Sequence, residues 1–108
     1  MNNKEYKNNE EQVARYMKAL AHPARVAIVR FLSSQECCYF GDIHEVLPIA
    51  KATVSQHLTE LKNSGLIQGE IMPPKVKYCI NKSAWNEAKE LISSFMESIN
   101  TEKKCCKE

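Results

Sequence analysis

Five cysteines are the residues of this chain whose type and spacing are best suited to chemistry. Cys37 and Cys38 are adjacent, Cys105 and Cys106 are adjacent, and Cys79 stands alone. Soft thiolate ligands select soft ions, so the two pairs could bind a thiophilic metalloid such as trivalent arsenic or antimony. The same thiols could instead be switched by peroxide or persulfide chemistry. Because the number is odd and cytosolic thiols stay reduced, we do not expect a disulfide framework.

The second pair lies in a strongly charged tail. Cys105 and Cys106 are surrounded by three cations, Lys103, Lys104 and Lys107. Nearby positive charge lowers the pKa of a thiol and favours the reactive thiolate. Burial is hard to reconcile with such a tail, so we expect a ligand or redox role for this pair.

The other three cysteines have competing interpretations. Cys79 alternates within a run of strand-forming residues, which favours a packing role. Cys37 and Cys38 could also pack as small apolar side chains, but their adjacency favours binding of an ion. A four-cysteine zinc site is disfavoured because adjacent cysteines lack the Cys-x₂₋₄-Cys spacing that is usual in structural zinc sites.

Length and composition predict one small globular domain. The chain has 108 residues, of which 44% are hydrophobic and 26% are charged. It has no apolar run near the roughly 20 residues that cross a bilayer, and its first residues are polar, so we expect a cytoplasmic protein with no membrane partner. We expect a flexible segment over residues 1–8, a domain over 9–99 and a charged tail over 100–108. The net charge of +2 is too small to indicate a nucleic-acid partner by itself.

Apolar periodicity and turn signals divide the domain into elements that could position these thiols. Helical periodicity of apolar residues predicts helices over 9–21, 22–33 and 51–63, and a short helix that Pro48 ends. Two strand-like runs, 66–72 and 76–80, flank a proline turn and predict a hairpin. A final helix begins near Ser83 and carries a broad apolar stripe that includes Trp85 and Phe95. The expected fold is mainly α with a small β-hairpin, in the order α-α-α-α-β-β-α.

The third and fourth predicted helices form a helix-turn-helix. Val54, Leu58 and Leu61 mark the inward face of the fourth helix. Its predicted outward residues are of the types that contact phosphates and base edges in the major groove, and they are Lys51, Thr53, Ser55, Gln56, His57 and Lys62. Lys75 and Lys77 near the hairpin tip would contact the adjacent DNA backbone. The alternative interpretation is that these polar residues form an ordinary solvated surface that does not contact DNA.

Three segments carry a family resemblance: KALAHPARVAIVRFL, TVSQHLTELKNSGLI and KVKYCI. They resemble the ArsR/SmtB family of small metal-responsive winged helix-turn-helix repressors, and the resemblance extends from Val13 to Met96. It implies a homodimer formed through the first and last helices. It also implies binding to palindromic double-stranded operator DNA and repression that an inducer relieves.

The resemblance also suggests the inducer. Arsenic-responsive members have a thiol cluster, commonly Cys-x-Cys-Asp, at the start of the first helix of the helix-turn-helix. The corresponding segment here is ECCYFGDI, in which the thiols are adjacent and lie nearer the preceding loop. We therefore expect trivalent arsenic or antimony to bind Cys37 and Cys38, with a third sulfur from Cys105 or Cys106, and we expect no permanent cofactor. The histidine-containing zinc site that other members have on the last helix is missing, because no histidine follows His57.

Two other function classes remain open at this point. One is the same repressor switched by thiol oxidation or persulfide formation. The other is a thiol-based metal carrier or enzyme. The sequence argues against an enzyme, because it offers no Cys-x-x-Cys on a βαβ pattern, no nucleotide-binding loop and no set of nucleophile, base and orienting residue.

Overall fold

The computed structural model describes residues 8–35 and 37–102. The helices and strands of this part of the chain follow in the order α1 (Asn8–Leu20), α2 (Pro23–Gln35), β1 (Cys37–Tyr39), α3 (Phe40–Glu45), α4 (Lys51–Ser64), β2 (Ile67–Met72), β3 (Lys75–Ile80) and α5 (Lys82–Ser98). The predicted helices and both hairpin strands are all present, with ends shifted by a few residues.

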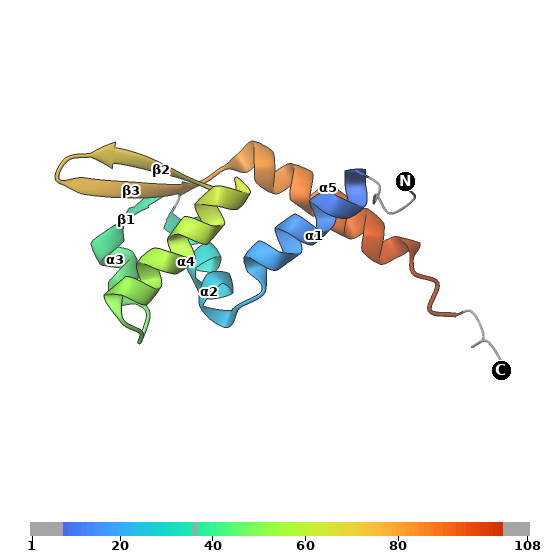
Figure 1. The fold of residues 1–108 in the computed structure, drawn as a ribbon, viewed down its shortest axis with the longest axis horizontal. Coiled ribbons are helices and arrows are strands. Elements are labelled where there is room, and N and C mark those ends of the chain that lie inside the picture. The colour runs from blue at the N-terminus through green and yellow to red at the C-terminus, as the bar shows by residue number, and fades with distance from the viewer. Residues whose placement is uncertain (1–7, 36, 103–108) are drawn as a thin grey trace, which may run out of the picture.

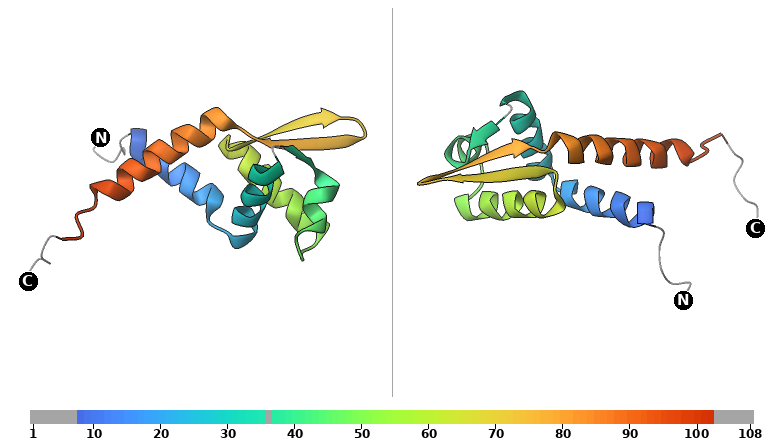
Figure 2. Two further views of the ribbon diagram at one scale, coloured as in Figure 1. Left: turned by 180° about the vertical axis from the view of Figure 1, so that it is seen from behind. Right: turned by 90° about the horizontal axis from the view of Figure 1, so that it is seen from above.

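The molecule has a head and an arm. The head contains α2, α3, α4 and the sheet, whereas α1 and α5 lie side by side as an arm that extends from it (Figure 1). The two further views in Figure 2 show the same arrangement. The principal extents are 59 × 30 × 23 Å and the radius of gyration is 17.1 Å, whereas a compact domain of this length has a radius of about 13 Å. Within the described part of the chain, α5 packs mainly against α1, whereas α1 also contacts α2 and α4.

The sheet differs from the predicted two-stranded hairpin. It has three antiparallel strands in the order β1-β3-β2. The added strand, β1, contains Cys37 and Cys38, for which the sequence predicts a loop. An unpaired strand edge leaves backbone N–H and C=O groups exposed, and pairing with even a three-residue segment satisfies several of them. The first cysteine pair is consequently tied to the central strand of the sheet.

The core lies where the head helices meet the base of the sheet. Its fully buried side chains come from every layer of the head and include Ile28, Leu32, Ile43, Val54, Leu58, Leu61, Leu66 and Ile67. The expected inward face of α4 is thus confirmed. Val26 of α2 is an exception among the apolar residues of the head helices, because it is 41% exposed.

The helix ends explain how the chain passes from α4 to the sheet and from the sheet to the arm. Gly65 has φ 92°, the left-handed conformation that commonly ends a helix, and its N–H donates to Lys62 O at 3.0 Å. At the start of α5 the cap is Asn81 rather than Ser83. The Asn81 Oδ1 atom accepts a hydrogen bond from the Ala84 N–H at 3.2 Å.

Candidate nucleic-acid interface

The exposed face of α4 is the centre of the candidate interface. Lys51, Thr53, Ser55 and Gln56 are all exposed in the first turns of the helix, as predicted. Ala50 precedes them in an extended conformation and makes no side-chain hydrogen bond to the start of the helix. First-turn N–H groups form a binding site for phosphate at a helix N-terminus. This end of α4 therefore combines hydrogen-bonding side chains with positive charge.

His57 does not belong to this face, which corrects the prediction from the sequence. It is only 7% exposed, and its Nδ1 atom accepts a hydrogen bond from Arg25 Nε at 3.0 Å. Its ring also packs against His22, with the ring centroids 4.4 Å apart. Because His57 lies three residues after the buried Val54, it shares the inward face of the helix. Its role is to hold α4 against α2.

The environment of His57 predicts a pH-dependent stability. Burial, followed by the charges of His22 and Arg25, lowers the pKa of His57 below its ordinary value of 6.5. The unfolded chain therefore binds this proton more readily than the folded chain, and the free energy of unfolding falls as the pH drops below 6.5. Stability is retained above that pH, where the imidazole is neutral in both states.

Denaturant unfolding at about pH 7.5 and about pH 5.5 tests this expectation. The wild-type chain should lose more stability on acidification than His57→Gln, which keeps an acceptor for Arg25 but cannot titrate. Equal losses in the two proteins would mean that His57 does not carry the pH dependence.

Lys62 also lies away from the predicted group. It is eleven residues from Lys51, about 16 Å along the helix axis. Its aliphatic carbons lie over β2, because a Cβ placed on Gly69 would be 3.4 Å from Lys62 Cδ. Lys62 is exposed, but the structure places it beside the sheet rather than with the residues at the start of α4.

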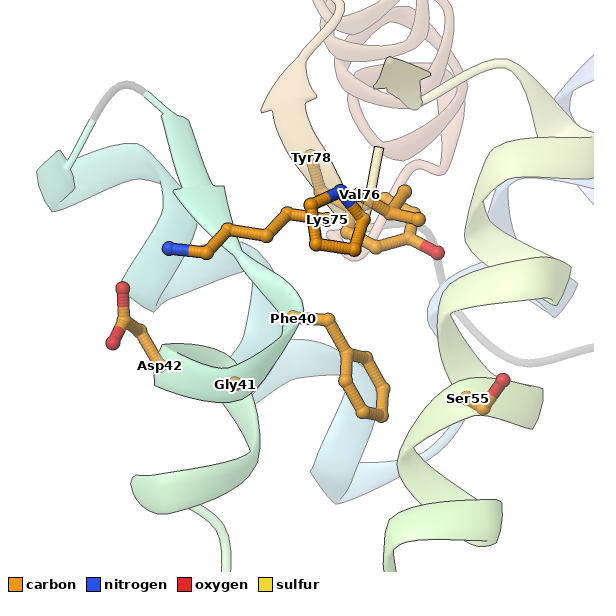
Figure 3. Close-up of a pocket in the computed structure, with 8 residues that line it drawn as sticks. Phe40, Gly41, Asp42, Ser55, Lys75, Val76 and Tyr78 are labelled. Carbon is orange, nitrogen blue, oxygen red and sulfur yellow. The ribbon is translucent and has the colours of Figure 1, made fainter. Parts of the chain in front are cut away.

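A cleft of about 510 Å³ separates the start of α4 from the hairpin, and α3 forms its third side (Figure 3). Ser55 of α4, Phe40 of α3 and Tyr78 of β3 line it, and Lys75 extends across it towards the side on which Asp42 lies. Burial raises the pKa of Tyr78, so its phenol stays neutral. The hairpin, α3 and the start of α4 thus border one cleft.

The two hairpin lysines are in different situations. Lys75 is exposed at the start of β3. Lys77 has a side chain that is only 28% exposed, and its Nζ lies 3.4 Å from Glu70 Oε1 on the opposite strand. Because Glu70 already neutralises part of its charge, Lys77 is only partly available to another anion.

The structure brings one unexpected pair of cysteines together. Cys37 of β1 is the register partner of Cys79 of β3, whereas Cys38 is opposite Tyr78. Cys79 is half-buried and disulfide-bonded, whereas the sequence predicts reduced thiols and favours a packing role for this residue. Directly opposite residues of antiparallel strands have Cα separations within the range of disulfides. The sequence could have indicated this pairing only if a third strand had been predicted at Cys37.

The rest of the predicted metal site is not assembled in the described part of the chain. Cys105 and Cys106 lie outside the described residues. Within residues 8–35 and 37–102, no group of three or more histidine, cysteine, aspartate or glutamate side chains is arranged to hold a metal ion. The predicted set of Cys37, Cys38 and a tail cysteine therefore stays a prediction.

Comparison with known proteins identifies the family. Residues 22–68 match the model described as "Bacterial regulatory protein, arsR family", and these residues span α2 to the start of β2. The regulator YgaV of Escherichia coli is 30% identical over 76 residues, which cover 70% of this chain and 77% of that protein. The chain belongs to the ArsR family of bacterial regulatory proteins. It is therefore a helix-turn-helix transcriptional regulator rather than an enzyme.

Solved structures show the same fold as this ArsR-family chain. An ArsR-like transcriptional regulator from Rhodococcus superposes with a TM-score of 0.72 at 16% identity, covering 85% of this chain and 86% of that one. The transcriptional repressor BigR from Xylella fastidiosa gives 0.65 at 22% identity, covering 94% and 99%. The winged helix-turn-helix prediction is thus confirmed, with β2 and β3 as the wing. None of the helices in the described part of the chain is long and apolar enough to cross a membrane.

Proposed function

We propose that this ArsR-family regulator represses transcription as a homodimer on double-stranded operator DNA, and that a thiophilic trivalent metalloid releases it. The observation that carries the proposal is the position of the first cysteine pair. Cys37 and Cys38 form β1, which passes directly into α3, the first helix of the helix-turn-helix, and which also pairs with the wing strand β3. An ion bound there would act on both parts of the DNA-binding surface.

Base recognition is assigned to the exposed start of α4. Gln56→Ala should weaken specific operator binding by about 1–3 kcal/mol, because a glutamine side chain can form two hydrogen bonds to a base edge. Asn63→Ala is a matched control, because Asn63 is an exposed amide at the other end of the same helix. A fluorescence anisotropy titration at one salt concentration measures both. Equal losses in the two variants would place recognition elsewhere on the molecule.

The wing is assigned to the DNA backbone. Lys75→Ala should weaken binding to all sequences and reduce the slope of log K against log salt by about 0.9, the contribution of a single neutralised phosphate. Lys77→Ala should reduce the slope by less than about 0.9, because Lys77 is already paired with Glu70. Titrations at several salt concentrations measure the slopes, and an unchanged slope for Lys75→Ala would remove the wing from the interface.

We assign the interface of the homodimer to the arm formed by α1 and α5. An apolar-lined groove of about 440 Å³ runs between α1 and α5, and Val13, Met17, Leu91 and Phe95 are among its lining residues. Phe95, Met96 and Ile99 are 43%, 60% and 55% exposed, although apolar side chains of this size gain most from burial. Trp85, which belongs to the apolar stripe of the last helix, is half-buried against the core of its own chain. The proposed interface therefore lies towards the end of α5 that is far from the head.

Release of DNA by a metalloid is tested with reduced protein. Arsenite should consume free thiols and lower operator affinity by about 5- to 150-fold, the usual range of allosteric coupling. The double variant Cys37→Ser/Cys38→Ser should bind the operator normally and lose the response, because neither residue lies on α4. Arsenite that leaves operator affinity unchanged under reducing conditions would contradict the proposal.

A second candidate is release by thiol oxidation. It is favoured by one observation, the disulfide at Cys79 on the wing strand. On this view peroxide lowers operator affinity without any metalloid, and a reductant restores it. The two candidates differ in whether arsenite acts while a reductant is present.

A further inference from the structure

We propose that Cys79 is a ligand of the inducer site and that it forms, with Cys37, a dithiol across β1 and β3 that binds the trivalent metalloid. The inference rests on the proposed function and changes its ligand set. Cys79 replaces Cys38 as the nearest thiol partner of Cys37. The tail cysteines are then not needed to form a two-sulfur site.

The strand geometry separates the adjacent pair. Cys37 and Cys38 occupy successive positions of β1, and successive positions of a strand belong to opposite faces of a sheet. A regular strand therefore does not present two adjacent cysteines to one ion. The register places Cys37 opposite Cys79 and Cys38 opposite Tyr78. Residues directly opposite in an antiparallel ladder have Cβ atoms about 4.5–5.5 Å apart and share a face.

The disulfide at Cys79 is independent support for a neighbouring thiol. It requires a second sulfur at bonding distance from the Cys79 Sγ atom. We assign that sulfur to Cys37, because it is the register partner. Two thiols that can form a disulfide are close enough to chelate one arsenic atom once they are reduced.

The face on which Cys79 lies is accessible to a small reagent. Tyr78 and Ile80 pack against the hydrophobic core, so the intervening Cys79 belongs to the other face of the sheet. The ion pair between Lys77 and Glu70 lies on that same outer face, because Lys77 is two residues from Cys79. Cys79 is half-buried rather than enclosed.

The reaction is a condensation without change of oxidation state. Arsenous acid, As(OH)₃, reacts with the two thiols to form two As–S bonds and one retained As–OH, and the two thiol protons leave with two hydroxyl groups as two molecules of water. The disulfide is the product of two-electron oxidation of the same pair and has no thiol left to react. Metalloid binding therefore requires the reduced protein.

The site would connect the two parts of the DNA-binding surface. β1 continues into α3, which precedes α4 in the helix-turn-helix, and β3 carries the wing lysines. A sulfur–arsenic–sulfur link would set the spacing between the start of α3 and the wing. The DNA-binding surface would have a DNA-bound and a released arrangement. An ion can shift the equilibrium between them only if it binds the released arrangement more tightly than the DNA-bound one.

Phenylarsine oxide is the probe, because it reacts selectively with paired thiols. The full-length chain is reduced and freed of reductant under nitrogen, and thiol loss and operator affinity are then measured during titration. Cys79→Ser and Cys37→Ser should each weaken phenylarsine oxide binding by roughly 100-fold or more, because the second bond of a chelate is intramolecular. Cys38→Ser and the double variant Cys105→Ser/Cys106→Ser should bind within about threefold of the wild type.

The outcomes separate this inference from the proposed function. Wild-type protein that does not bind the arsenical overturns both. Wild-type protein that responds while Cys79→Ser responds equally overturns the inference and leaves the repressor proposal intact. Peptide mapping of peroxide-treated wild-type protein is a second test that needs no variant. A peptide joining Cys37 to Cys79 is expected, and Cys79 joined instead to Cys105 or Cys106 would overturn the assignment.

Discussion

Replacing Arg25 with alanine should lower the free energy of unfolding by about 2 kcal/mol, because hydrogen bonds to a charged group contribute about 1.5–3 kcal/mol. The Arg25 Nε atom donates to His57 Nδ1 at 3.0 Å. Its Nη1 atom donates to Ala19 O at 3.2 Å and Lys18 O at 3.4 Å. These carbonyls end α1, where positive charge is also favoured by the helix dipole. Arg25 thus joins α1, α2 and α4.

Removal of this side chain also leaves the buried Nδ1 of His57 without its donor. A cost of about 2 kcal/mol should lower the Tm by roughly 8–16 °C for a chain of this size. Calorimetry must be done at one protein concentration, because the Tm of the proposed dimer would depend on concentration. Arg30→Ala is the matched control, since Arg30 is an exposed arginine on the same helix. Similar melting temperatures for the two variants would show that the hydrogen bonds of Arg25 contribute little.

Elements whose signal is local could be predicted from the sequence. The periodicity of Val54, Leu58 and Leu61 predicts the inward face of α4, and Gly65 predicts its end. The hairpin follows from two β-rich runs around a proline turn. Each of these signals is produced by neighbouring residues and needs no knowledge of distant ones.

The features that could not be predicted depend on contacts between distant segments. β1 has only three residues, too few for alternation to be visible, and it forms because β3 offers an unpaired edge. His57 is polar, which predicts an outward position. It is buried because Arg25, 32 residues earlier, supplies its hydrogen bond. Both corrections concern residues whose partners lie on another element.

The sequence predicts only those parts of the candidate site that depend on neighbouring residues. Lys51, Thr53, Ser55 and Gln56 are exposed together because they share one face of a single helix. The pairing of Cys37 with Cys79 joins segments 42 residues apart and depends on the register of β1 against β3. A rule based on the spacing of cysteines in the sequence identifies the adjacent pair Cys37 and Cys38. It cannot identify Cys37 and Cys79, which are brought together by the pairing of two strands.

The largest effect on DNA binding should come from a residue far from the DNA. Phe95→Glu places a charge in the groove between α1 and α5, where the proposed dimer interface lies. Phe95 is 43% exposed in the single chain, so the substitution should leave the fold of each chain intact. A buried, unpaired carboxylate in the dimer is costly, and we therefore expect a folded monomer.

A monomer should bind the operator at least roughly 100-fold more weakly than the dimer. Two linked DNA-binding domains gain a factor of about 10²–10⁴ in affinity over a single one. A symmetric dimer fixes the two α4 helices about 34 Å apart, the separation of successive major-groove half-sites. Ser93→Glu is the matched control, since Ser93 is exposed two residues earlier, and it lines a different surface of α5 together with Lys89 and Glu90. Sedimentation velocity at micromolar concentration and an operator titration measure the two effects. If Phe95→Glu remains a dimer with normal operator affinity, the arm groove is not the interface, and dimerisation must involve another surface of the chain.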